Sequence, residues 1–140
     1  MKSCIFCIFL SFIFLTELTF AQTEPWKTLL NVKSEQQRDA HIPRFESKQK
    51  NLDGKEITLT GYMYAFEEAP RHMVFMLSYY PVASCYFCGG AGPESVMEVN
   101  MKKPVKFVGY PITLKGTLRL NATDPERLFY ILLQAEIVED

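Results

Sequence analysis

The chain has 140 residues, a formal net charge of −1, a hydrophobic content of 48% and a charged content of 22%. A chain of this length and composition is expected to form one compact domain. The nearly neutral charge excludes a nucleic-acid groove, which needs a clear excess of Lys and Arg to neutralise phosphates. We therefore expect no nucleic acid among its partners.

The first 21 residues have the organisation of a secretory signal peptide. Lys2 gives the start a positive charge, the stretch from Ile5 to Leu15 is almost uninterrupted apolar, and Ala21 offers a small residue for cleavage before Gln22. Glu17 interrupts the apolar run, which is shorter than the ~20 residues a spanning helix needs. The sequence thus predicts a secreted or periplasmic protein with no membrane span after cleavage.

Residues 22–50 are predicted to form an N-terminal extension of mixed polar composition. Pro25 stands where a helix can begin, so a short helix is expected over 25–38. Residues 41–45 are expected to be extended, because the residue before Pro43 avoids the helical region.

Residues 51–140 are predicted to form a mainly β domain, because from Glu56 apolar and polar residues alternate with a period of two. The expected strands are 56–64, 72–77, 96–101, 112–120 and 128–138. Gly61 and Gly116 fall halfway along two of them, where glycine marks a sharp bend or a bulge. Lys102-Lys103-Pro104 is expected to end the third strand.

On the last strand, the alternation favours an inner face made of Phe129, Ile131, Leu133, Ala135 and Ile137.

Five strands with mid-strand glycines and hairpin-length connections suit a small closed barrel, since closure removes exposed sheet edges. In outline this resembles an OB-fold, although residues 102–111 are barely long enough for the helix that such barrels often carry between their third and fourth strands. An immunoglobulin-like sandwich is the alternative, but five strands are fewer than its usual seven. The prediction is a small five-stranded OB-like barrel.

Three short motifs carry a resemblance to known proteins: Leu52-Asp53-Gly54-Lys55, Thr60-Gly61-Tyr62-Met63, and the cysteine and glycine stretch that ends in Gly92-Pro93-Glu94-Ser95-Val96. Together they resemble a group of small secreted bacterial proteins of uncharacterised function, over about residues 40–140. The resemblance implies a site at the cysteines that is shared with that group. It supplies no reaction.

The stretch from Cys85 to Ser95 is the part of the domain whose composition indicates chemistry. It holds both cysteines that remain after signal cleavage, spaced Cys-x-x-Cys and followed by glycines. Two thiolates in this spacing can chelate one metal ion, and the small residues after the second cysteine let backbone N–H groups face the sulfurs. The stretch lies between two expected strands, whereas a thioredoxin-type pair opens a helix that stabilises the thiolate.

A structural zinc site takes four ligands, of which Cys85 and Cys88 supply two. We expect His72 as a third ligand, because it begins the strand that precedes the motif. The other sources are His41, Glu94, solvent, and the same cysteines of a second subunit in a homodimer. The sequence thus predicts an exported zinc-binding barrel without catalysis of its own.

Copper is the alternative metal, since soft thiolate and thioether ligands select Cu(I). The mature chain has the methionines Met63, Met73, Met76, Met97 and Met101. Met63, Met97 and Met101 fall on the apolar faces of expected strands, which favours a role in the core.

Two functions of other classes stay open. An exported thiol–disulfide enzyme would use the same cysteine pair, with Arg71 and His72 as the nearby cationic groups that could stabilise a thiolate. An envelope interaction module would bind protein or glycan through an aromatic wall. That wall would consist of Tyr79, Tyr80, Tyr86 and Phe87.

Overall fold

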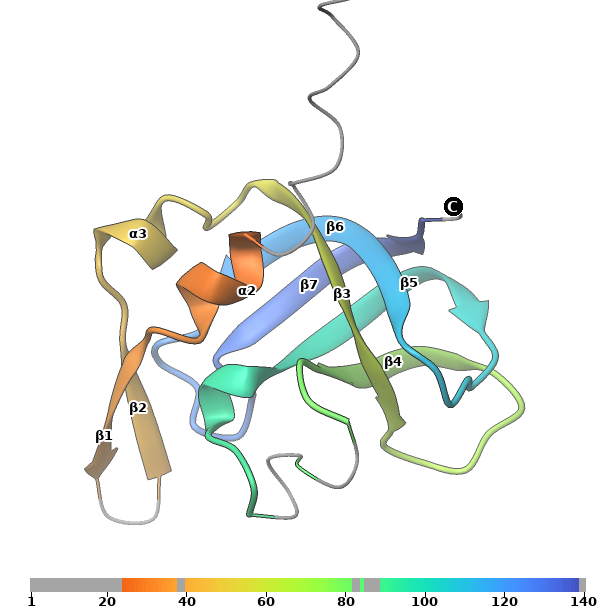
Figure 1. Cartoon of the computed structure of the whole chain (residues 1–140), viewed down its shortest axis with the longest axis horizontal. Coiled ribbons are helices and arrows are strands. Elements are labelled where there is room, and N and C mark those ends of the chain that lie inside the picture. The colour runs from red at the N-terminus through yellow and green to blue at the C-terminus, as the bar shows by residue number, and fades with distance from the viewer. Residues whose placement is uncertain (1–23, 38–39, 82–83, 85–88, 139–140) are drawn as a thin grey trace, which may run out of the picture.

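The computed structural model describes residues 24–37, 40–81, 84 and 89–138. Its centre is a closed barrel with the strand order β3-β4-β5-β7-β6 (Figure 1). The barrel strands are β3 (Glu56–Ala65), β4 (His72–Ser78), β5 (Val96–Val105), β6 (Ile112–Leu120) and β7 (Tyr130–Ile137). The predicted mainly β class and the small five-stranded barrel are confirmed.

The strand pairing is that of an OB-like barrel. β3, β4 and β5 form an antiparallel meander, and β6 returns to pair with β3. β7 then lies between β6 and β5, antiparallel to the first and parallel to the second. Every barrel strand therefore has two neighbours, and no strand is left as a free edge of the sheet.

This pairing distributes the connections over two ends of the barrel. The β3–β4 connection (66–71) and the β5–β6 connection (106–111) lie at one end, together with the end of β7. The β4–β5 connection (79–95) and the β6–β7 connection (121–129) lie at the other. The cysteine stretch thus belongs to the second end.

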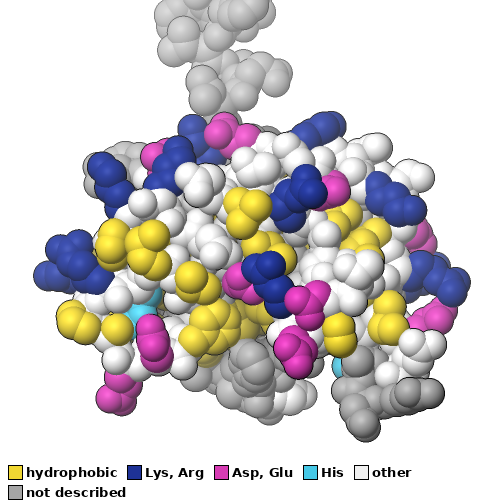
Figure 2. All heavy atoms as spheres, turned by 180° about the vertical axis from the view of Figure 1, so that it is seen from behind, with side chains coloured by type: hydrophobic (Ala, Val, Ile, Leu, Met, Phe, Trp, Pro, Cys, Tyr) yellow, Lys and Arg dark blue, Asp and Glu magenta, His cyan; other side chains and the backbone are white. Residues whose placement is uncertain are grey.

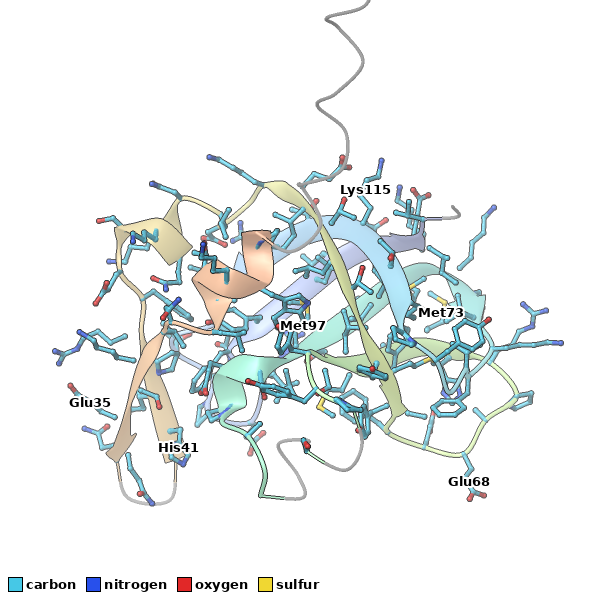
Figure 3. All side chains as sticks on the ribbon, viewed as in Figure 1. Glu35, His41, Glu68, Met73, Met97 and Lys115 are labelled. Atoms are coloured by element: carbon cyan, nitrogen blue, oxygen red, sulfur yellow. The ribbon has the colours of Figure 1, made fainter. Side chains whose placement is uncertain are left out.

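The core is filled by alternate residues of the strands. On β3, Ile57, Leu59, Gly61 and Met63 are buried while the residues that alternate with them are partly exposed, and β6 repeats the pattern up to Leu118. Met63, Met97 and Met101 all belong to the main hydrophobic cluster, and Figure 3 shows Met97 inside the barrel. Their predicted role in the core is confirmed.

The N-terminal helix α2 (Glu24–Leu29) packs against the barrel. The Trp26 indole Nε1 donates a hydrogen bond to the Thr60 carbonyl at 2.9 Å, and the Tyr130 hydroxyl donates to the Leu29 carbonyl at 2.8 Å. Trp26 and Leu29 are at most 2% exposed. The helix therefore covers apolar surface that the barrel strands alone would leave open.

The helix predicted over 25–38 is wrong in length. It stops at Leu29, and the chain continues as a hairpin of β1 (Lys33–Gln37) and β2 (Ala40–Arg44). Residues 33–37 are exposed throughout, so they offer no apolar stripe that a helix could bury. The extended conformation predicted for 41–45 is confirmed over β2.

A single helical turn, α3 (Ser47–Lys50), joins the hairpin to the barrel. Glu46 and Gln49 form a reciprocal capping box at its start. The buried Gln49 side chain also donates from Nε2 to the Thr28 carbonyl at 2.9 Å, which ties the turn to the end of α2.

The predicted end of the third strand at Lys102-Lys103-Pro104 is wrong, because β5 runs to Val105. The register with β4 moves from Val74↔Asn100 directly to His72↔Val105, so these residues lie in an irregular part of the ladder. A proline, which has no N–H to donate, is tolerated at such a position.

The inner face predicted for the last strand is right for Phe129 and Ala135, which lie in the core, and wrong for Leu133 and Ile137. Tyr130 and Leu132 are fully buried in the core, whereas Ile137 is 45% exposed. Beyond Leu132 the register shifts at Gln134, and this shift returns Ala135 to the core. Since residues 130–133 are all apolar, alternation alone could not fix which of them point inward.

Glu98 on β5 is held by Arg127 from the β6–β7 connection. Arg127 donates to the Glu98 carboxylate from Nε at 3.1 Å and from Nη2, and Asn100 donates from Nδ2 at 3.0 Å. Burial alone would raise the pKa of Glu98, but these hydrogen bonds and the Arg127 charge lower it below its ordinary value of 4.5.

On the rear face of the molecule, positive and negative side chains are mixed, and neither sign of charge dominates (Figure 2).

A lowered pKa in the folded state gives stability that is present above the unfolded pKa and is lost as pH falls through the folded value. We therefore expect Glu98→Gln to flatten the loss of stability below about pH 4.5. Urea denaturation over about pH 3–7 measures this, with Glu126→Gln as an exposed control. If the variant lost stability below pH 4.5 as steeply as the unchanged protein, the lowered pKa would not belong to Glu98.

Candidate functional site

The cysteine loop, residues 79–95, joins the end of β4 to the start of β5. Ser78 and Val96 are paired across the two strands, and the Tyr79 N–H donates to the Ser95 carbonyl at 2.9 Å. The loop therefore leaves and re-enters the barrel at one closed base. The ligands predicted from the sequence, Cys85 and Cys88, lie outside the described residues, so the described parts of the loop frame the site.

Two fully buried serines fix the backbone at this base. The Ser78 hydroxyl donates to the Tyr80 carbonyl at 2.8 Å and accepts from the Tyr80 N–H at 3.2 Å. The Ser95 hydroxyl donates to the Gly92 carbonyl at 2.6 Å, and Pro93–Ser95 forms a 3-10 turn. Both stems of the loop are thus held by side chains that solvent does not reach.

The backbone on the two sides of the cysteine pair comes into contact. A Cβ atom on Gly90 would lie 3.0 Å from the Cα and carbonyl carbon of Ser84, the residue before Cys85. Gly89, directly after Cys88, has a φ of 77°, which favours glycine strongly. The described chain at Gly90 therefore lies beside the described chain at Ser84.

Aromatic rings line the base on the side of the N-terminal helix. The Tyr79 ring lies 5.6 Å from the Trp26 ring and 4.9 Å from the Tyr80 ring. Tyr79 and Tyr80 remain 40% and 37% exposed. They supply the described half of the predicted aromatic wall; Tyr86 and Phe87 lie outside the described residues.

His72 lies at the opposite end of β4 from the cysteine loop. It pairs with Val105, whereas the loop base begins at Ser78. The six steps of an extended strand between His72 and Ser78 correspond to about 20 Å. His72 is 4% exposed, and its Nδ1 atom has no hydrogen-bond partner among the described residues. Burial of this strand end was not expected from the sequence.

His41 lies on the β1–β2 hairpin, at one side of the molecule (Figure 3). It is exposed and pairs with Gln36. With residues 121–125 it borders a cavity of about 120 Å³, smaller than the 300–1,000 Å³ usual for small-molecule sites. The hairpin thus places His41 beside the β6–β7 connection, at the same end of the barrel as the cysteine loop.

Glu94 is the predicted ligand that lies within the cysteine loop itself. Its carboxylate folds back over Gly92, so that a side chain at Gly92 would overlap it. Burial, and then the negative charge of Glu94, raise the pKa of Tyr130 far above its ordinary value. The Tyr130 hydroxyl therefore stays protonated and donates to Leu29, as described above.

Within the described residues, no three His, Cys, Asp or Glu side chains form a metal-sized group. The same residues contain no helix long and apolar enough to cross a membrane.

The sequence did not predict the hydrogen bonds by which Ser78 and Ser95 hold the base of the loop. The run Gly92-Pro93-Glu94-Ser95 is a turn signal that could have indicated the second of them.

The chain matches no family model and no curated protein sequence. Among solved structures, it is similar to the crystal structure of a DUF3299 family protein from Pseudomonas aeruginosa. The TM-score is 0.51 at 21% identity, covering 70% of this chain and 68% of that chain. At this identity the likeness shows the fold alone: this small barrel has a structural neighbour in a family of uncharacterised function.

Proposed function

We propose that the protein is an exported barrel that binds a transition metal through Cys85 and Cys88, and that this metal is zinc. The observation that supports this most is the close approach of the backbones of Ser84 and Gly90, the described residues on either side of the cysteine pair. Two cysteines in the Cys-x-x-Cys spacing suit two thiolates that converge on one ion. Copper(I), another ion that thiolates bind, is the alternative metal.

The described chain after Cys88 supports a ligand role over redox catalysis. It continues through glycines to the three-residue turn Pro93–Ser95, and neither is the α-helix that lowers a thiolate pKa in disulfide oxidoreductases. A thiol–disulfide enzyme nevertheless uses the same two cysteines. If a disulfide between Cys85 and Cys88 had a reduction potential below about −300 mV, it would be an inert bond, and the protein would not be a thiol–disulfide enzyme.

Several groups could complete the metal shell, and we rank Glu94 ahead of His72. Glu94 lies in the loop and turns back toward its glycines, whereas His72 lies about 20 Å along β4 from the base of the loop. We therefore propose Glu94 as the third ligand, with solvent or the cysteines of a second copy at the fourth position. His72 is the ligand that must be tested against it.

The test is metal content and free-thiol count of the protein recovered after export. We expect stoichiometric zinc and two cysteines that become titratable when the metal is removed. Cys85→Ser and Cys88→Ser should each abolish metal binding while circular dichroism shows an intact barrel. Protein without stoichiometric metal and with both thiols oxidised would overturn the proposal.

Three further variants in the same assay locate the ligands. Glu94→Gln should weaken zinc binding by at least roughly 10–100-fold, the loss typical of an altered supporting group. His72→Gln should leave affinity unchanged; the reverse result would restore His72 to the site. Gly90→Ala should weaken binding because its methyl group meets Ser84, whereas Gly109→Ala, with no atom within 4 Å of the added carbon, should not.

A further inference from the structure

β5 and β7 separate toward the barrel end that lies opposite the cysteine loop. Their parallel pairing stops at Met101↔Ala135, although β5 continues to Val105 and β7 to Ile137. Beyond this point β5 bends toward the connection to β6, whereas β7 runs on beside β6 (Figure 1). A groove opens between the two strands.

A bulge in β7 produces this separation. Gln134 has a φ of 53°, in the left-handed region that non-glycine residues rarely adopt. Three steps of β7, from Leu132 to Ala135, face two steps of β5, so β7 carries one extra residue. β6 makes room with Gly116, where a Cβ would lie 2.9 Å from the Leu133 carbonyl. Bulges of this kind often stand beside functional sites.

The groove has a volume of about 370 Å³, within the 300–1,000 Å³ of small-molecule sites. Its lining residues are Met101, Lys102, Lys103, Val105, Ala135, Glu136 and Ile137. The Lys102 Nζ lies 3.1 Å from the Glu136 carboxylate on the facing strand. Lys103 is exposed and has no ion pair with another described residue. The groove thus combines an apolar floor with one uncommitted cation at its rim.

The sequence of β5 here disfavours the addition of another protein strand. Lys102, Lys103 and Pro104 follow one another along this part of the strand. Lysine and proline are the residues that protect sheet edges from pairing with a further strand, and proline has no N–H to offer. The occupant is therefore better sought among small molecules than among extended peptides.

We propose that this groove binds a small amphipathic anion, namely a carboxylate with one aliphatic chain. The chain would lie on Met101, Val105 and Ile137, and the carboxylate would meet the free ammonium group of Lys103. Charge complementarity supports this choice, because pairing Lys102 with Glu136 leaves Lys103 as the unbalanced charge of the lining. The site does not depend on the proposed metal, which would bind at the other end of the barrel.

The test is a titration of the folded protein, as it is purified, with dodecanoate below its micellar concentration, followed by NMR of the backbone amides. We expect saturable shifts at residues 101–103, 105 and 135–137. A half-open groove and a ligand of this size imply a Kd no tighter than roughly 0.1 mM. Shifts confined to the cysteine loop, or no saturable shifts, would overturn the proposal.

Two variants and a neutral ligand test the chemistry. Lys103→Gln should raise the Kd roughly two- to fivefold, as expected for the loss of one exposed ion pair. Ile137→Ser should also weaken binding, whereas Lys48→Gln on α3 should not. Dodecanol, which has the same chain without the charge, should bind more weakly; equal binding of dodecanol would refute the role of Lys103.

Discussion

Replacing Trp26 with alanine is expected to lower the free energy of unfolding by about 3–5 kcal/mol. The indole is 2% exposed, donates to the Thr60 carbonyl and packs against Tyr79. Its removal would leave a cavity between α2 and the barrel and a carbonyl without its donor. Urea denaturation followed by far-ultraviolet circular dichroism measures the change, because this signal does not need the tryptophan.

The controls separate packing from hydrogen bonding. Trp26→Phe keeps most of the ring contact, so it should lose less stability than Trp26→Ala. The expected loss is about 1 kcal/mol for the missing hydrogen bond, plus a smaller loss from packing. Lys27→Ala changes an exposed neighbour on the same helix and should stay within about 0.5 kcal/mol. A loss below about 1 kcal/mol for Trp26→Ala would show that α2 is not part of the core.

Gly61→Ala is expected to destabilise the barrel by about 1–3 kcal/mol, and Gly61→Val by more. A Cβ at this position would lie 2.6 Å from the Ser78 carbonyl oxygen and 2.9 Å from Leu77 Cγ. The oxygen belongs to the backbone of β4, which the ladder with β3 and β5 holds in place. The strand must shift, and the shift reaches Ser78 at the base of the cysteine loop.

Thermal and urea unfolding of Gly61→Ala give this number. Gly109→Ala is the matched control, because no heavy atom lies within 4 Å of its added carbon. It should change stability by no more than about 0.5 kcal/mol. Equal effects at the two positions would mean that the close approach of β3 and β4 carries no cost.

The barrel could be predicted because its strands alternate in the way a half-buried strand must. Residues 56–64 and 112–120 place apolar residues or glycine at every second position, and the structure buries these positions except Leu120, which is partly exposed. Gly61 and Gly116 were expected at bends or bulges. Both stand where a neighbouring strand leaves no space for a side chain.

The failures have local physical reasons. β7 begins with four consecutive apolar residues, so their pattern does not show which of them face the core. The positive φ of Gln134 could not be predicted from its residue type. The helix at the N-terminus ends early because residues 33–37 gain more from pairing with β2 than from an exposed helical turn. The continuation of β5 through Pro104 depends on a register shift that only the folded ladder defines.

For the candidate site, the sequence indicated the loop but could not set its distance from His72. The order of the chain makes His72 look close, since it starts the strand that leads to the loop. An extended strand separates its two ends more than any other element of equal length, so this nearness in sequence becomes about 20 Å in space. The contact of Ser84 with Gly90 joins residues on both sides of the cysteines and has no sequence signal of its own.

The hydrogen bond from Tyr130 to Leu29 has a consequence for how the chain folds. It joins residues 101 positions apart, and β3 must likewise wait for β6 before the barrel can close. Such long sequence separations place the chain among slow folders, on the millisecond to second scale, because loop entropy is lost before these contacts form.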